Sequence, residues 1–107
     1  MGFNRELKMK KLEKVSDYDK VLENVNQYFR PYTKKDIYFD VSTRKYNKYM
    51  IKGDFTKNKF IHFGHIDYED YTKHKDETRR NAFLTRNSKW LNELPNTPAF
   101  LSYILLW

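Results

Sequence analysis

All three histidines of this chain lie in one stretch, HFGHIDYEDYTKHKD, residues 62–76, together with four carboxylates. Imidazole and carboxylate groups bind divalent metal ions and transfer protons. A zinc site without cysteine needs at least three such side chains in convergent positions. The candidate ligands form two sets, His62 with His65 and Asp67, and Asp70 with His74 and Asp76.

A metal-dependent nuclease is the most specific chemistry that this stretch could support. A nuclease needs a general base, carboxylates that hold Mg²⁺ and a cation that steadies the phosphate. The residues in those roles would be His62 or His74 as the base, Asp70 and Asp76 as Mg²⁺ ligands, and Arg79 or Arg80 at the phosphate.

A structural interpretation of the same stretch is simpler, and we favour it. Asp, Thr and Asn side chains commonly organise turns and helix starts through hydrogen bonds to nearby backbone groups. Because the spacing matches no metal-ligand signature, we predict neither a metal nor another cofactor. The expected roles are Asp70 or Thr72 capping a turn, His74 donating to a carbonyl, Asp76 capping a helix, His62 half-buried on a strand, and Tyr68 and Tyr71 packing beneath.

A second candidate site is the hairpin TRKYNKYMIKGDFTKNK, residues 43–59, which interleaves cations with aromatic residues. Cations attract phosphates, and exposed aromatic rings stack on unpaired bases. The alternative is an edge hairpin that lysines protect from pairing with another sheet. The predicted nucleic-acid-binding residues are Arg44, Lys45, Tyr46, Lys48, Tyr49, Lys52, Lys57 and Lys59, with Arg79 and Arg80 from a later helix.

Composition and charge narrow the class of protein. At 107 residues the length fits one domain. The net charge of +7 suggests a polyanionic partner, and its excess lies in the first two thirds of the chain. The absence of cysteine excludes disulfides and thiolate chemistry. Since no apolar run is long enough for a membrane span, we expect the cytosol, the nucleus or a particle assembled there as the location.

Hydrophobic periodicity predicts an α+β fold. Apolar residues at three- and four-residue steps predict a helix over 17–29, with Ser16 as its N-cap and Pro31 after its end. Strands are expected at 36–43, 46–54 and 58–64, and their short connections favour an antiparallel meander. Helices are expected after Asp76 and after Thr97. We therefore predict an N-terminal helix, a three-stranded meander and C-terminal helices packed on the sheet.

The two ends of the chain have different characters. Residues 1–15 are lysine-rich with little pattern, so we expect a flexible basic arm or a frayed helix outside a domain of residues 16–107. The last segment, AFLSYILLW, is apolar on nearly every side. We expect it to insert into the core rather than dock on a partner, because a small domain needs that apolar area.

Residues 46–107 resemble a family of short, uncharacterised proteins encoded by large double-stranded DNA viruses. The shared pattern is K-Y-hydrophobic, then K-x-hydrophobic-H-F-G, then Y-x-D-[FY]-T-x-H-x-D-x-x-R, and a closing L-L-W. In this chain the pattern falls on Lys48, Tyr49, Lys59, His62, Phe63, Gly64, Tyr68, Asp70, Tyr71, Thr72, His74, Asp76, Arg79 and Trp107. The resemblance implies a viral context and no defined activity.

Together these features predict a small, basic, non-enzymatic accessory or structural protein of a large DNA virus that binds nucleic acid without sequence specificity. The alternative is a minor capsid or assembly protein that acts through contacts with other virion proteins. A metal-dependent nuclease is the third possibility. A phosphate binder loses affinity steeply with salt, whereas an aromatic-anchored protein interface does so much less.

Overall fold

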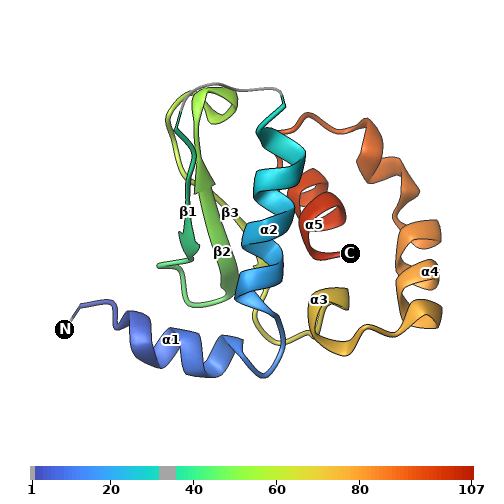
Figure 1. The fold of residues 1–107 in the computed structure, drawn as a ribbon, viewed down its shortest axis with the longest axis horizontal. Helices are drawn as coiled ribbons and strands as arrows, with labels where there is room; N and C mark the ends of the chain where they lie inside the picture. The colour runs from blue at the N-terminus through green and yellow to red at the C-terminus, as the bar shows by residue number, and fades with distance from the viewer. Residues whose placement is uncertain (1, 32–35) are drawn as a thin grey trace.

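The chain folds around one three-stranded antiparallel sheet, shown in Figure 1. The computed structural model describes residues 2–31 and 36–107. The predicted α+β class is confirmed, because helices precede and follow a meander of strand order β1-β2-β3. The elements are α1 Arg5–Leu12, α2 Tyr18–Phe29, β1 Tyr38–Val41, β2 Asn47–Lys52, the 3₁₀ turn η1 Asp54–Thr56, β3 Ile61–His65, α3 Tyr71–His74, α4 Glu77–Arg86, the 3₁₀ turn η2 Ser88–Asn92, and α5 Pro98–Leu106.

Strand register gives the sheet two different faces. Val41 pairs with Tyr49, which pairs with Phe63, and these three buried side chains belong to the inner face. The alternate residues of each strand belong to the outer face. In Figure 1, α2 and α5 lie on one side of the sheet, and they cover the inner face.

Helices α2 and α5 supply the rest of the core. Val21, Val25 and Phe29 of α2 are buried at helical spacing. The prediction that AFLSYILLW enters the core is confirmed, since Leu101 and Leu105 of α5 are fully buried. Thr97 caps α5, as expected, by accepting from the Phe100 N–H.

The predicted cap of α2 was wrong by one residue. Asp17, not Ser16, is the N-cap, and its side chain accepts from the Lys20 N–H at 3.2 Å. Both residue types cap helices well, so local preference could not separate them. Ser16 is instead buried in a polar cluster described below.

Residues 1–15 were expected to form a flexible basic arm or a frayed helix, and the structure has a helix, α1, that contacts the sheet. Leu12 of α1 is 1% exposed within the core, and Arg5 pairs with Asp40 of β1 at 2.9 Å. Lys8 Nζ donates to the backbone oxygens of Arg44 and Asn47 at 2.7 and 2.6 Å. Helix α1 thus packs against the domain predicted for residues 16–107 and contributes Leu12 to its core.

Within the described ranges, no helix is long and apolar enough to cross a membrane.

Candidate nucleic-acid interface

A buried polar cluster surrounds Asp70. Its Oδ2 accepts from Ser16 Oγ at 2.7 Å and from Lys48 Nζ at 3.0 Å, and its Oδ1 accepts from Thr72 Oγ1. Tyr49 OH donates to Ser16 Oγ at 2.7 Å. The side chains of Lys48 and Asp70 are 3% and 1% exposed, so the ion pair is shielded from water.

Burial shifts the pKa values of two groups in this cluster. Burial lowers the pKa of Lys48, and the nearby Asp70 carboxylate opposes that shift. Burial also raises the pKa of Tyr49 far above its ordinary value. The phenol therefore remains protonated and donates to Ser16. Both carboxylate oxygens of Asp70 accept hydrogen bonds from within the fold, which indicates a structural role for the cluster.

The three histidines make local contacts. His62 Nδ1 lies 2.6 Å from Ser42 Oγ on the half-buried outer face, in line with the structural interpretation. His65 Nδ1 accepts from the Asp67 N–H at 3.1 Å, and His74 Nδ1 accepts from the Asp76 N–H at 3.0 Å. The expectation that His74 donates to a carbonyl was wrong, since its contacting nitrogen accepts.

The candidate nuclease residues do not converge. Asp76 caps α4 by accepting from the Thr78 and Arg79 N–H groups, as the structural interpretation expected. Asp70 is held by Lys48 in the interior. In the described part of the chain, no three His, Asp or Glu side chains are placed to hold a metal ion.

Two tyrosines lie elsewhere than expected. Tyr68 is 68% exposed, so the prediction that it packs beneath the turn was wrong. Tyr71 is half-buried and bonds Glu77, while the Arg80 guanidinium lies 4.9 Å from its ring centroid. The pattern of polar residues around them gave no indication of which rings would point outward.

The predicted hairpin interface needs a correction at its centre. Lys48 and Tyr49 are 2% and 0% exposed, so neither side chain presents itself to a nucleic acid. Lys48 is drawn inward by Asp70, and Tyr49 belongs to the inner face of β2. The remaining predicted hairpin residues are accessible, namely Arg44, Lys45, Tyr46, Lys57 and Lys59 as exposed residues and Lys52 as a half-buried one.

On the outer face of the sheet, the predicted residue Lys52 lies between two aromatic rings that sequence analysis missed, those of Tyr38 and Phe60. Tyr38 of β1 pairs with Lys52 of β2, and Lys52 Nζ lies 4.8 Å from the Tyr38 ring centroid and 4.7 Å from that of Phe60. Tyr38 is 59% exposed and Phe60 39% exposed. The residue types were visible in the sequence, but only the register places one lysine between two rings.

The next row of the outer face is less exposed. Asp40 pairs with Met50, which pairs with His62. Burial lowers the pKa of His62, and the positive charges of Arg44 and Lys8 lower it further. The outer face is thus flanked by cations at the β1–β2 turn, next to α1.

The two arginines predicted from α4 have different surroundings. Arg80 Nε donates to the Trp107 backbone oxygen at 2.8 Å, so this side chain is engaged within the fold. Arg79 is exposed, and its side chain forms no ion pair with any described residue. Figure 1 shows α4 on the side of the molecule away from β1. The predicted residues therefore do not form one continuous surface.

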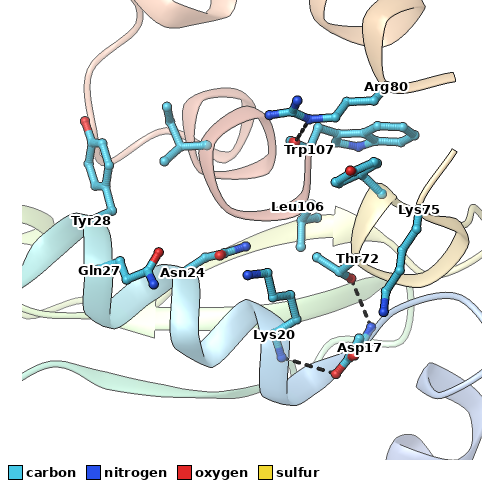
Figure 2. Close-up of a pocket in the computed structure, with 12 residues that line it drawn as sticks. Asp17, Lys20, Asn24, Gln27, Tyr28, Thr72, Lys75, Arg80, Leu106 and Trp107 are labelled. Carbon is cyan, nitrogen blue, oxygen red and sulfur yellow. Dashed lines mark hydrogen bonds between the residues drawn. The ribbon is translucent and has the colours of Figure 1, made fainter. Parts of the chain in front are cut away.

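A groove of about 750 Å³ lies between α2, α3 and α5, as Figure 2 shows. Its cations are Lys20, Lys75 and Arg80. Lys20 pairs with Glu23 at 3.4 Å, and Arg80 is held by Trp107. Among the described residues, Lys75 is therefore the cation of this groove with no ion pair or side-chain hydrogen bond, and the acidic Asp17 also lines the groove. The groove is for this reason a poorer site for a polyanion than the outer face of the sheet.

Residues 37–87 match a family of unknown function (DUF5754). The matched region contains the sheet, α3 and α4, and it leaves out α1, α2 and α5. No curated protein and no solved structure matches the chain.

Proposed function

We propose that this protein binds nucleic acid without sequence specificity through the outer face of its sheet. The observation that carries the proposal is the row Tyr38–Lys52–Phe60, in which one ammonium lies over two exposed rings. Exposed rings on a sheet accept stacked bases, and an adjacent lysine attracts the phosphate backbone.

Further cations flank this row at both ends of β2. Arg44 and Lys45 lie at the β1–β2 turn, and Lys57 and Lys59 lie at the β2–β3 connection. Strand β2 spans six residues, so the two ends are roughly 17 Å apart at about 3.4 Å per residue. An extended strand that crosses the outer face would meet a cation at each end and the aromatic row beside one of them.

The rings favour unpaired strands over a duplex. Bases within a duplex are stacked on each other and cannot also stack on a protein ring without being unstacked. Phosphate contacts by lysine and arginine carry no sequence information. The expected ligand is therefore single-stranded nucleic acid of any sequence, and the expected biological role is an accessory or structural protein that coats or packages nucleic acid of a large DNA virus.

A role in protein assembly is the second candidate, and an exposed apolar segment favours it. Leu91 and Leu94, in and after η2, are 48% and 67% exposed. Side chains of this kind take part in interfaces between proteins when they lie together on a surface. A minor capsid or assembly protein would use this segment rather than the outer face.

Binding of a labelled single strand to charge and ring variants tests the first proposal. We expect Lys52→Glu to weaken binding by about tenfold or more, because it places a carboxylate between the two rings. Phe60→Ala should cost roughly tenfold for a single strand and less for a duplex, given about 1–3 kcal/mol for each stacked base. Fluorescence anisotropy measures both affinities.

Matched controls are available in and after η2. Lys89→Glu makes the same charge change at an exposed site away from the sheet, and Leu94→Ala removes a side chain that is more exposed than Phe60. Equal affinities of the Lys52→Glu and Lys89→Glu variants would refute the outer-face site. A denaturing gel of the same samples with Mg²⁺ should show intact strands, and metal-dependent cleavage would favour the nuclease instead.

A further inference from the structure

A second concave site lies between β3 and α4. It is a cleft of about 470 Å³, which we call the β3–α4 cleft. One wall is α4, from which Arg79, Phe83 and Arg86 line the cleft. Residues at three- and four-residue steps share one face of a helix, so these three side chains form one stripe. The stripe has a cation at each end and a ring in the middle.

Aromatic side chains from three other segments complete the cleft. Phe83 stacks on Trp107, with ring centroids 4.1 Å apart and planes 7° apart, and Trp90 packs edge-on against Phe83 at 5.7 Å. Tyr68 lies on the opposite wall and is 68% exposed. The cleft therefore has a floor of packed aromatic rings, those of Phe83, Trp90 and Trp107, and one accessible ring, that of Tyr68.

Its arginines are free to bind a ligand. Among the described residues, Arg79 and Arg86 have no ion pair and no side-chain hydrogen bond. The cations of the groove in Figure 2 are largely engaged, by contrast. Glu69 is the acidic residue that lines the β3–α4 cleft, and it comes from the segment between β3 and α3 rather than from α4. An anionic ligand should therefore place its charge toward α4.

The spacing of the two arginines defines the ligand. Arg79 and Arg86 are seven positions apart on α4, about 10 Å along the helix axis. Side chains that extend outward from these two positions can each meet a separate phosphate, and one nucleoside with a phosphate on either side supplies two. Arginine also binds phosphate in a bidentate manner, and aromatic rings stack on bases.

We propose that the β3–α4 cleft binds one nucleoside that carries a phosphate on either side. Its nucleobase would lie against the aromatic rings of the cleft, with one phosphate at Arg79 and the other at Arg86. The ligand is either a free nucleoside bisphosphate or one unpaired residue within a strand. Only the second source depends on the proposed function, and it adds a second contact point away from the outer face.

The chain's two tryptophans provide a direct readout, because Trp90 and Trp107 both line this cleft. Tryptophan fluorescence is recorded during titration with adenosine 3′,5′-bisphosphate, AMP, adenosine and inorganic phosphate. We expect the bisphosphate to change the emission at the lowest concentration, with AMP about tenfold weaker. Loss of one charge-assisted contact is worth about a factor of ten.

Variants assign the effect to the two arginines. Arg79→Gln and Arg86→Gln should each weaken bisphosphate binding by about tenfold, whereas Arg30→Gln, at an exposed arginine after α2, should leave it unchanged. Both cleft arginines are exposed, so these substitutions should alter stability little.

The outcomes separate this site from the outer-face site. A response to the bisphosphate supports the cleft even if no oligonucleotide binds. A short oligonucleotide at saturating concentration tests whether the ligand is one nucleotide of a strand. If so, it should change the tryptophan emission of the Lys52→Glu variant as it does that of the unmodified protein, and Arg86→Gln should weaken this change. Unchanged tryptophan emission with both ligands refutes the cleft, whether or not anisotropy shows strand binding. Equal responses to inorganic phosphate and to the bisphosphate would also refute it.

Discussion

Asp70 should be the most sensitive residue in the molecule to a small chemical change. Asp70→Asn retains the size of the side chain but leaves the Lys48 ammonium, 3% exposed, without a counter-charge. Removing one partner of a buried ion pair costs about 3–5 kcal/mol. We expect a loss of about 3 kcal/mol in the free energy of unfolding, measured by urea denaturation.

Asp76→Asn is the matched control, because it makes the same change at an exposed helix cap. Asn caps helices about as well as Asp, so stability should change by less than about 0.5 kcal/mol. If both variants lose the same amount, the Lys48–Asp70 pair does not hold the fold together as described.

The pKa of His74 gives a second prediction at this scale. Burial lowers this pKa from its ordinary value of 6.5, and Arg79 lowers it further. The unfolded chain then takes up protons before the folded chain as the pH falls. The contribution of His74 is therefore complete above about pH 6.5 and is lost as the pH falls below that value.

An NMR titration of the imidazole Cε1–H signals measures this directly. The His62 pKa is lowered as well, mainly by burial, so both signals should titrate below pH 6.5. His74→Gln should reduce the loss of stability in mild acid. A midpoint for His74 at or above 6.5 would contradict the neutral imidazole that accepts from the Asp76 N–H.

Single residues could be predicted from sequence where their role is local. Asp76 and Thr97 were assigned as caps correctly, since a cap depends on residues two or three positions away. The burial of Lys48 and its pairing with Asp70 could not be predicted from neighbouring residues. Its partner Asp70 is 22 positions away, and a lysine between tyrosines in a strand ordinarily points to solvent.

Gly64 allows α5 to pack closely against β3, because it has no side chain at the contact between these two elements. Its φ of +77° lies in the region that favours glycine. A Cβ at this position would lie 2.9 Å from Leu106 Cδ1 and 3.2 Å from Lys48 Cβ. We expect Gly64→Ala to lower the free energy of unfolding by about 2–3 kcal/mol, from backbone strain and overpacking together.

Gly2→Ala controls for the change in residue type, since nothing lies within 4 Å of a Cβ built there. Thermal unfolding should give the parent midpoint for Gly2→Ala and a lower one for Gly64→Ala. Equal midpoints would show that α5 can shift away from β3 without cost.

Element types were easier to predict than element contacts. Strong periodicity identified α2, and alternation identified the strands to within a few residues. Helix α1 has little amphipathic pattern, so its docking on β1 followed only from the three-dimensional positions of Leu12 and Arg5. The row Tyr38–Lys52–Phe60 was missed for a similar reason, because it depends on register between strands.

Salt dependence tests the proposed function on the whole molecule. The cations expected to meet phosphate on the outer face are Arg44, Lys45, Lys52, Lys57 and Lys59. A single strand contributes about −0.7 to the slope of log K against log salt for each phosphate neutralised, so five contacts predict a slope near −3.5. Lys52→Gln should make the slope shallower by about 0.7. A slope near zero would favour assembly through the apolar segment around η2.

The match to residues 37–87 has a consequence for the molecule as a whole. That region contains the outer-face residues and most of the residues that line the β3–α4 cleft, but it lacks the two helices that cover the inner face. Tyr49, Ile51 and Phe63 would lie open to water without α2 and α5. The matched region therefore depends on α2 and α5, outside it, to complete its core.

The Asp70 cluster also bears on how the chain reaches this structure. Ser16, Lys48 and Asp70 belong to three segments, and the bond between Ser16 and Asp70 spans 54 residues of sequence. Each long-range closure costs chain entropy before it gains energy, and domains with many such contacts fold more slowly than those with local ones. A charged group that leaves water without a partner loses free energy, so the burial of Lys48 and Asp70 is favourable only when the three segments meet. We therefore expect these contacts to form late in folding, and substitutions at Lys48 or Asp70 to speed unfolding more than they slow folding.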